Sequence, residues 1–245
     1  MASRHRLFVD QPLTPNSNIV LDADASHYLA RVLRLRPGAQ VELFNGDGYN
    51  YASTLTDANK NAAELLLAER SAHPAANPKL HLAIGLLKGD KLDYVLQKAT
   101  ELDVASVYLL TTQRSELKLS GKRLTNRLTH WSRIVRSACE QSGRTNIPKL
   151  YAPTSIRAVL DQTIGMQGYF LEPSAEPGEL QVRTSDVCLF TGPEGGFSPA
   201  ELELLAISCT GVQLGELVLR AETAPLVGLA LAGAARRARH LAEQR

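Results

Sequence analysis

Short apolar stretches separated by turn-forming residues fill the first third of the chain. They predict strands over 7–9, 18–21, 40–44 and 49–55. The sequence NGDG at 45–48 predicts a hairpin turn between the last two strands. One helix is expected over 26–35, because Leu29, Val32 and Leu33 share a face at helical spacing. Short strands with a single helix indicate a small β-barrel.

A different pattern begins after residue 79. The apolar run 80–87 predicts a buried strand, a helix with regular apolar spacing starts near Asp90, and 104–110 predicts the next strand. This β-α-β alternation implies a parallel sheet. The two prolines of 73–78 block both helix and strand, so this segment is the expected linker. The expected domains are therefore 1–72 and 73–245.

Two helices are expected in the second domain at some distance from these strands. The first covers 122–142, with Gly143 placed to end it. Its apolar face includes Trp131, which is therefore expected in the core rather than as a platform that stacks a base. The following segment 140–148 is polar and rich in hydrogen-bond donors, which suits a site that holds a nucleotide. The last helix, over 224–242, carries small residues that permit close approach of another helix.

Two segments combine an apolar run with a glycine-bearing loop and the start of a helix. The first consists of the apolar run 187–190, the loop GPEGG at 192–196, and Ser198 as the N-cap of a helix with a capping box. The second segment, 214–225, has the same order of features. Glycine lets a ligand approach the backbone closely, and open α/β domains bind small molecules in loops at strand ends. Together the segments predict one small-molecule pocket.

Composition places the chain among ordinary globular proteins. It has 245 residues, of which 44% are hydrophobic and 21% are charged. No apolar run could span a membrane and the N-terminus lacks the apolar core of a signal peptide, so a cytoplasmic protein without membrane contact is expected. Cys139, Cys188 and Cys209 lack metal-ligand spacing and are expected to be reduced thiols, with no metal bound.

The net charge of +2 hides an uneven distribution. Between residues 112 and 149, nine Lys and Arg residues stand against two Glu, a net charge of +7, whereas 1–72 carries −1. A solvated helix face normally mixes both signs, so this block favours a polyanionic partner such as RNA. The pattern of the N-terminal domain suits binding of protein or of RNA equally well, and its arginines favour RNA.

Segments from four separated parts of the chain resemble, in order, the RsmE family of the SPOUT class of S-adenosylmethionine-dependent RNA methyltransferases. They are RLFVD, HYLARVLRLRPG and VELFNGDG in the N-terminal third, EQSGR to IP at 140–148, GPEGG at 192–196, and LGELVLRAETAP at 214–225. The resemblance implies an α/β fold, in which a small PUA-like β-barrel precedes a SPOUT-type parallel-sheet methyltransferase domain knotted as a trefoil. It also implies methylation of N3 of a uridine in bacterial 16S ribosomal RNA, uridine 1498 in the family.

Residues of these segments are predicted for three roles. S-adenosylmethionine, the methyl donor, would be held by Leu171, Gly192, Glu194, Gly195, Gly196, Leu214, Gly215, Leu217 and Leu219. RNA would be bound by Arg6, Arg31, Arg34, Gln141 and Arg144. The catalytic candidates are Arg220, Glu222 and Glu140. The resemblance further implies a homodimer whose partner is 16S ribosomal RNA, either free or within the assembled small subunit.

The chemistry explains the catalytic candidates. Uridine N3 carries a proton at neutral pH, so a nucleophile must be generated; Arg220 could stabilise the resulting anion, and Glu222 or Glu140 could accept the proton. N3 is engaged in base pairing, so the target must be unpaired or extruded. The chain departs from the family in having Asp103 in place of Gly and Ala221 in place of Thr. Asp tolerates the left-handed conformation, whereas the missing hydroxyl leaves position 221 without an assigned role.

Two functions of other classes fit the same residues. One is a non-catalytic RNA-binding or ribosome-assembly factor, which would not bind the methyl donor. The other is a Rossmann-type nucleotide enzyme that uses the GPEGG loop, although the chain lacks G-x-G-x-x-G. Two single residues also have structural alternatives: Glu194 could brace its own loop, and Arg220 could form a salt bridge with Glu222.

Overall fold

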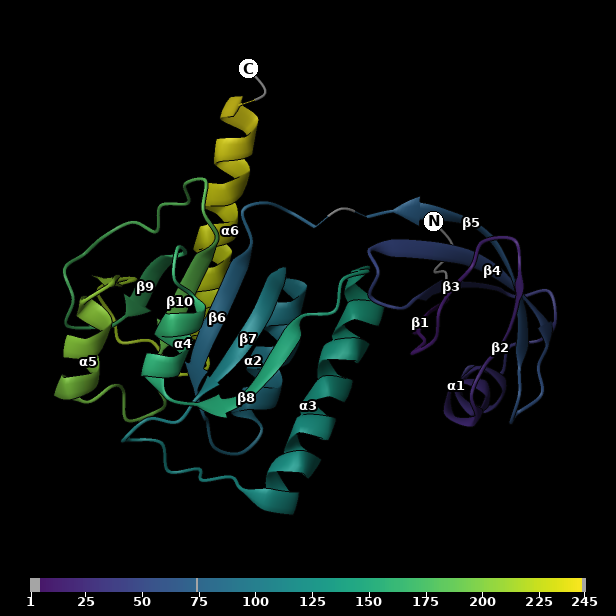
Figure 1. Ribbon diagram of the computed structural model, residues 1–245, viewed down its shortest axis with the longest axis horizontal. Helices are drawn as coiled ribbons and strands as arrows, with labels where there is room; N and C mark the ends of the chain where they lie inside the picture. Colours follow the sequence, from purple (N-terminus) through teal and green to yellow (C-terminus); the bar gives the residue numbers. More distant parts are fainter. Residues whose placement is uncertain (1–4, 74, 244–245) are drawn as a thin grey trace. The chain divides into compact units, whose positions relative to one another are not determined.

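The structure is a computed structural model that describes residues 5–73 and 75–243, and it divides into two compact units (Figure 1). Unit 1 comprises 1–75 together with 139–147, and unit 2 comprises 76–138 together with 148–245. The segment 139–147 thus belongs with the N-terminal unit although it lies far along the sequence. The first four residues and Pro74 of the expected linker lie outside the described residues.

Unit 1 is built on one five-stranded sheet in the order β1-β3-β4-β5-β2. β1 pairs with β3 in parallel, and the other neighbours are antiparallel. The strands are β1 His5–Phe8, β2 Asn18–Val20, β3 Gln40–Phe44, β4 Tyr49–Asp57 and β5 Glu64–Ala72. The predicted turn joins β3 to β4, and its Gly46 and Gly48 have φ angles of +93° and +90°, which other residues rarely adopt.

Two elements of unit 1 differ from the sequence prediction. The sequence analysis does not predict strand β5. Three consecutive leucines, 65–67, are good helix formers and show no alternation of apolar and polar residues, although in the strand Leu65 and Leu67 are buried and Leu66 is exposed. The expected helix begins earlier, as α1 Ala23–His27, and continues as a π-helical turn, η1 Tyr28–Val32. The wider turn leaves Val32 59% exposed, whereas Leu29 is fully buried. The prediction of Val32 on the apolar face is therefore wrong.

Arg6 joins β1 to the segment 139–147 within unit 1. Its Nε donates to a carboxylate oxygen of Glu42 at 2.6 Å, and one Nη2 hydrogen is directed to Asn50 Oδ1 at 2.8 Å. The other three N–H groups face backbone carbonyls at the end of α3 (Gly121–Ser142) and just beyond it, those of Cys139 (2.9 Å), Glu140 (3.4 Å) and Arg144 (3.2 Å). A helix C-terminus favours a cation, and all five guanidinium donors have an acceptor. This arrangement argues against the predicted RNA contact of Arg6 and assigns it to the fold.

Replacing Arg6 by Lys is expected to destabilise unit 1. An ammonium group offers one donor atom in place of the guanidinium fork, so it cannot reach all five acceptors and leaves several of them without a partner. A buried acceptor without a partner costs about 1–3 kcal/mol. Urea unfolding followed by circular dichroism should show a lower midpoint for Arg6→Lys than for the exposed control Arg31→Lys. Equal midpoints would contradict the structural role of Arg6.

Unit 2 holds a six-stranded sheet in the order β11-β9-β10-β6-β7-β8, and every pair in it is parallel. The predicted parallel sheet is therefore confirmed. Its strands are β6 Leu80–Gly85, β7 Val104–Leu110, β8 Lys149–Thr154, β9 Gln167–Leu171, β10 Val187–Thr191 and β11 Cys209–Val212. Its other helices are α2 Lys91–Glu101, α4 Ile156–Gln162, α5 Pro199–Ala206 and α6 Ala224–Glu243.

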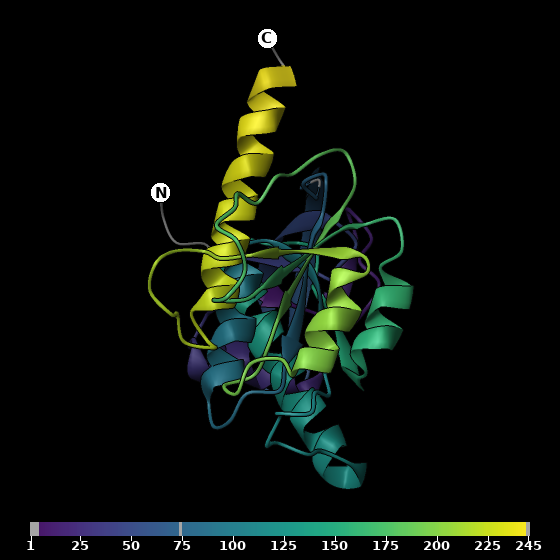
Figure 2. The same ribbon diagram turned by 90° about the vertical axis from the view of Figure 1, so that its left-hand side faces the viewer.

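Helices cover both faces of this sheet, with α6 on one side and α4 and α5 on the other (Figure 2). Strand β10 shows how the faces are divided, because successive side chains point to opposite sides. Its Cys188 and Phe190 belong to the core formed with α4 and α5. Its Leu189 lies against α6, since a Cβ on Gly228 would come within 3.3 Å of the Leu189 Cδ1 atom. Both faces of β10 are buried, as its uninterrupted apolar run predicts.

Several single-residue predictions agree with the structure. Trp131 is 1% exposed, and its Nε1 donates to Asp93 Oδ1 at 2.9 Å. Gly143 follows the end of α3 with φ +85°, and Asp103 has φ +66°, the left-handed conformation expected of it. The three cysteines are free.

No helix in the described part of the chain is long and apolar enough to cross a membrane. The trefoil knot stays a prediction.

Candidate functional site

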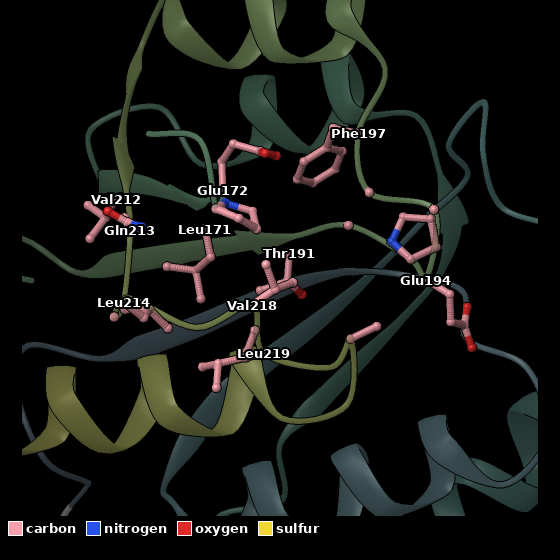
Figure 3. A pocket seen from close by; sticks show the side chains of 18 of the residues that line it. Leu171, Glu172, Thr191, Glu194, Phe197, Val212, Gln213, Leu214, Val218 and Leu219 are labelled. Atoms are coloured by element: carbon pink, nitrogen blue, oxygen red, sulfur yellow. The ribbon is translucent and has the colours of Figure 1, made fainter. Parts of the chain in front are cut away.

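A cavity of about 310 Å³ lies in unit 2 where β9, β10 and β11 end. The last residue of each of these strands, Leu171, Thr191 and Val212, lines it (Figure 3). The rest of the lining comes mainly from the loops that follow β10 and β11. All nine residues predicted to bind the donor line this cavity: Leu171, Gly192, Glu194, Gly195, Gly196, Leu214, Gly215, Leu217 and Leu219. The structure therefore brings the two glycine-bearing segments to one place.

The first loop, 192–198, is closely packed and requires small residues. A Cβ on Gly192 would lie 2.9 Å from the carbonyl carbon of Gly196, a distance that Cβ atoms essentially never show. Gly196 has φ +67°, which disfavours other residues there. The loop ends at the predicted capping box, in which the Ser198 side chain accepts from the Glu201 N–H and the Glu201 carboxylate accepts from the Ser198 N–H. These contacts give the loop one defined course over the cavity.

The segment after β7 holds this loop from a distant part of the sequence. Arg114 Nη1 donates to the carbonyl oxygens of Gly195 and Phe197 at 3.0 and 2.9 Å. The Gln113 N–H donates to Glu201 Oε1 at 2.8 Å. Arg114 itself lines the cavity. Although Arg114 belongs to the basic block at 112–149, these contacts give it the role of fixing the backbone of the first loop.

Lys91 at the start of α2 links the two glycine-bearing loops. Its ammonium lies 3.2 Å from Glu194 Oε1 and 3.5 Å from Glu222 Oε2. Glu194 also accepts a hydrogen bond from the Lys88 N–H at 3.1 Å. Burial by itself would raise the pKa of Glu194, but its backbone hydrogen bonds and the Lys91 ammonium outweigh burial and lower the pKa. The hydrogen bond with Glu194 raises the pKa of Lys91, so both groups are charged at neutral pH.

The side chain of Glu194 points away from the other labelled residues of the cavity (Figure 3). Its carboxylate contacts Lys88 and Lys91 instead of the open space. Of the two predicted roles of Glu194, the structure therefore favours bracing of its own loop. A contact of its backbone with a ligand stays a prediction.

The prediction that the segment 214–225 begins with a strand is wrong, because strand β11 ends at Val212 and the apolar residues that follow form the second loop. Leu217 and Val218 are 83% and 77% exposed although both line the cavity. Gly215 has open space around it, since a Cβ there would meet no atom within 4 Å. The cavity is therefore open on this side.

Two of the catalytic candidates follow the second loop directly. The Arg220 side chain is 83% exposed, and its ion-pair partner among the described residues is Glu222 Oε1, at 3.9 Å. The Glu222 side chain is 18% exposed; its Oε2 lies 3.5 Å from the Lys91 ammonium and accepts no hydrogen bond from the described residues. Arg220 is thus free to contact a substrate, and Glu222 has an oxygen available to accept a proton.

The third candidate, Glu140, belongs to unit 1, whereas the residues that line the cavity belong to unit 2. Its carboxylate accepts a hydrogen bond from the Phe8 N–H at 3.0 Å. Burial raises the pKa of Glu140, and the hydrogen bond from Phe8 opposes this shift. Its role as a proton acceptor stays a prediction.

The residues predicted to bind RNA all belong to unit 1, because Gln141 and Arg144 lie in the segment 139–147. Arg31, Arg34 and Gln141 are exposed, and Arg144 is half-buried. In unit 2 the basic block contributes further exposed cations: Lys118 before α3, Lys122 and Arg123 at its start, and Arg133 in its middle. Apart from Arg6, the predicted RNA-binding residues therefore remain compatible with contact to a phosphate backbone.

Among the residues that line the cavity, Arg114 and Thr191 are absent from the sequence prediction, and so is Lys91, which contacts Glu194 beside it. Arg114 follows β7 and Lys91 follows β6, and only their place at the carboxyl ends of strands in the same sheet could have indicated them. Thr191 ends the apolar run of β10, and a hydroxyl at the end of such a run is the signal in the sequence. No group of three or more His, Cys, Asp or Glu side chains within 5–73 and 75–243 is placed to hold a metal ion.

Comparison with known proteins agrees with this site. Residues 74–233 match the family of the RNA methyltransferase domain, and residues 21–67 match the RNA methyltransferase PUA domain. The chain is 31% identical over 235 residues to the ribosomal RNA small subunit methyltransferase E of Rickettsia conorii, covering 92% of this chain and 93% of that protein. It is 31% identical over 222 residues to the protein of the same name from Bacillus subtilis, covering 83% and 84%.

A solved structure is similar over nearly the whole chain. It is the ribosomal RNA small subunit methyltransferase E from Neisseria gonorrhoeae bound to S-adenosyl methionine, with a TM-score of 0.86 and 28% identity. The similarity covers 93% of this chain and 96% of that one.

Proposed function

The chain belongs to the ribosomal RNA small subunit methyltransferase E family, and we propose that it methylates N3 of a uridine in bacterial 16S ribosomal RNA with S-adenosylmethionine as donor. The proposed target is the family's uridine 1498. The observation that carries the proposal is the cavity at the ends of β9, β10 and β11, where both glycine-bearing loops meet. A small-molecule site is expected there in an open α/β domain.

The lining residues fit this donor. The volume of about 310 Å³ lies in the range of ligand pockets, and apolar side chains of Leu171, Val212 and Leu219 provide surfaces for an aromatic base. Polar groups are also present, in the backbone of the two loops and in the buried hydroxyl of Thr191. When bound, S-adenosylmethionine supplies a methyl group attached to a positively charged sulfur that leaves readily.

The residues of the chain then have to prepare the uridine. N3 loses its proton before it can act as a nucleophile, and the Glu222 carboxylate is proposed to accept this proton through Oε2, which accepts no hydrogen bond from the described residues. The negative charge that remains is shared by N3 and the neighbouring O2 and O4 oxygens of the base. The guanidinium of Arg220, exposed beside Glu222, is proposed to stabilise it. Glu140 stays an alternative acceptor.

A methylation assay tests the proposal directly. The purified protein is incubated with radiolabelled donor and either free 16S ribosomal RNA or assembled small subunits, and the product is mapped by reverse transcription. Methylation at N3 blocks base pairing, so the reverse transcriptase is expected to stop at one uridine. A protein that binds RNA but neither binds nor consumes the donor would instead support the non-catalytic assembly factor.

We propose that residues 1–72 form the RNA-binding domain and 73–245 the catalytic domain. The match of 21–67 to the PUA domain supports this division, as do the exposed Arg31 and Arg34. The basic start of α3 is proposed as a second RNA contact, through Lys122 and Arg123.

Replacing Arg31, Arg34, Lys122 and Arg123 together by Gln is expected to weaken the salt dependence of RNA binding. Each lost phosphate contact flattens the log–log plot of affinity against salt by about 0.7–0.9. Fluorescence anisotropy with a 16S fragment at several salt concentrations measures this slope. Arg157→Gln, an exposed cation on α4 outside the basic block, is the control and should leave the slope unchanged. An unchanged slope in the fourfold variant would place the RNA surface elsewhere.

A homodimer is proposed through α6. This helix projects beyond the sheet (Figures 1 and 2), and its buried face packs on unit 2. A second stripe of apolar residues, spaced alternately four and three apart, consists of Val227, Leu231, Ala234, Ala238 and Leu241. Leu231 is 46% exposed and Leu241 is 61% exposed. Such spacing is typical of the seam between two helices, and a second α6 is a partner of matching pattern.

Replacing Leu231 and Leu241 by Glu is expected to convert the dimer to a monomer. The contact between the two α6 helices would then bury carboxylates of like charge among apolar side chains. Sedimentation velocity measures the change. Ile164→Glu, at an 82% exposed position away from α6, should leave the assembly unchanged. If the wild-type protein sediments as a monomer at micromolar concentration, the proposed dimer is wrong.

A further inference from the structure

The hydroxyl of Thr191 is a buried polar group at the end of β10, in the wall of the cavity. Thr191 is 2% exposed, and its Oγ1 has no hydrogen-bond partner among the described residues. Within the described residues, Thr191 Oγ1 and Glu222 Oε2 are the only buried side-chain oxygen or nitrogen atoms that lack a hydrogen-bond partner. Buried hydroxyls normally have a partner, because burial removes their bonds to water.

The direction of the Thr191 side chain follows from the alternation of side chains along β10. Leu189 points toward α6, so Thr191, two residues later, points to the same side of the sheet. Figure 3 shows Leu171, Thr191 and Val218 turned toward one another across the cavity. Ala221 and Ala224, at the loop end and the start of α6, also line it. These neighbours are apolar and offer the hydroxyl no side-chain partner.

Valine has the shape of threonine without the hydroxyl. A purely structural position among apolar side chains would therefore be served better by valine, which fills the same volume and leaves no polar group unpaired. The three residues before Thr191 on this strand, 188–190, are fully buried and apolar or thiol-bearing. The hydroxyl thus lowers stability at this position unless a ligand satisfies it.

We propose that the Thr191 hydroxyl hydrogen-bonds a polar atom of the bound methyl donor and thereby contributes to its affinity and orientation. A hydroxyl can donate or accept, so it suits a ring nitrogen, an amino group or a ribose hydroxyl equally. The inference rests on the proposed function, because it takes the cavity to be the donor site. It adds a side-chain contact to a site that is otherwise expected to bind through backbone groups.

The test compares isosteric variants with and without donor. Thr191→Val removes only the hydroxyl, and Thr191→Ser keeps the hydroxyl while removing the methyl group. Thr100→Val is the matched control, since Thr100 is 1% exposed, donates to the Leu96 carbonyl at 2.8 Å and lies on α2 outside the cavity. Calorimetric titration with S-adenosylmethionine gives the affinity, and thermal unfolding without donor gives the stability.

The expected result has opposite signs in the two measurements. Thr191→Val should bind the donor about tenfold more weakly, as expected for loss of one hydrogen bond, and should melt at the same or a higher temperature than the wild type without donor. Thr191→Ser should bind within about threefold of the wild type. Thr100→Val should show the reverse pattern, with a lower melting temperature and unchanged donor affinity.

Two results would overturn the proposal. Unchanged donor affinity in Thr191→Val would show that the hydroxyl does not contact the donor. A lower melting temperature of the donor-free Thr191→Val protein, together with weaker binding, would show that the hydroxyl has a structural partner instead. If the wild-type protein itself fails to bind S-adenosylmethionine, the proposed function is wrong, and this outcome is distinguishable from the other two.

Discussion

Gly215→Val is expected to weaken binding of S-adenosylmethionine by about a hundredfold while leaving the protein folded. The structure gives the reason, because a Cβ at this position meets no atom within 4 Å and the fold has room for the new side chain. That room adjoins the cavity that Gly215 lines. Forcing extra carbon atoms into a filled site costs about 1–3 kcal/mol, which corresponds to roughly five- to 150-fold in affinity.

Gly195→Val should also weaken donor binding, but for a different reason. Its Cβ would lie 3.1 Å from the Arg114 Cβ, so the side chain that fixes the carbonyls of Gly195 and Phe197 has to move. We therefore expect a lower melting temperature for Gly195→Val and an unchanged one for Gly215→Val.

Calorimetry and thermal unfolding of both variants check this pair of expectations. Gly178→Val is the control, since Gly178 is exposed and does not line the cavity. Wild-type affinity in both Gly195→Val and Gly215→Val would remove the donor-site assignment.

The sequence predicts the first glycine-bearing segment of the proposed donor site well because its elements are local. The apolar run of β10, the glycines after it and the capping box at Ser198 are adjacent in the chain, and each is fixed by the conformations that its own residues allow. The parallel sheet follows from the alternation of elements. By contrast, the trefoil knot is implied by the resemblance alone, since no local pattern encodes a threaded path.

The contacts that hold the loops could not be predicted in the same way. Arg114 and Lys91 reach the site through the order of strands in the sheet, in which β6 lies beside β10 although a hundred residues separate them in the chain. Charge counting placed Arg114 in a basic block, and only the distances to Gly195 and Phe197 reveal its role. Arg6 is a similar case, because its five acceptors come from three distant segments. Long-range hydrogen bonds of this kind leave no periodic signal in a sequence.

Arg220→Ala is expected to slow methyl transfer by about a hundred- to a thousandfold while donor affinity stays within about threefold. Removing one donor that stabilises a developing negative charge typically has an effect of this size. A structural role is a weak alternative, because the guanidinium is 83% exposed and lies 3.9 Å from Glu222, and exposed ion pairs contribute little to stability. The melting temperature of Arg220→Ala should therefore match that of the wild type.

Single-turnover methylation of 16S ribosomal RNA at several pH values measures the role of Arg220. Raising the pH increases the fraction of uridine that has already lost its N3 proton, so the activity of Arg220→Ala should recover in part, with a steeper rise than in the wild type. Arg220→Lys keeps a positive charge without the planar guanidinium, so its methylation rate should lie between those of Arg220→Ala and the wild type. If Arg220→Ala instead loses donor affinity and melting temperature together, without recovery at high pH, then Arg220 holds the second loop through Glu222 and takes no part in stabilising the uridine anion.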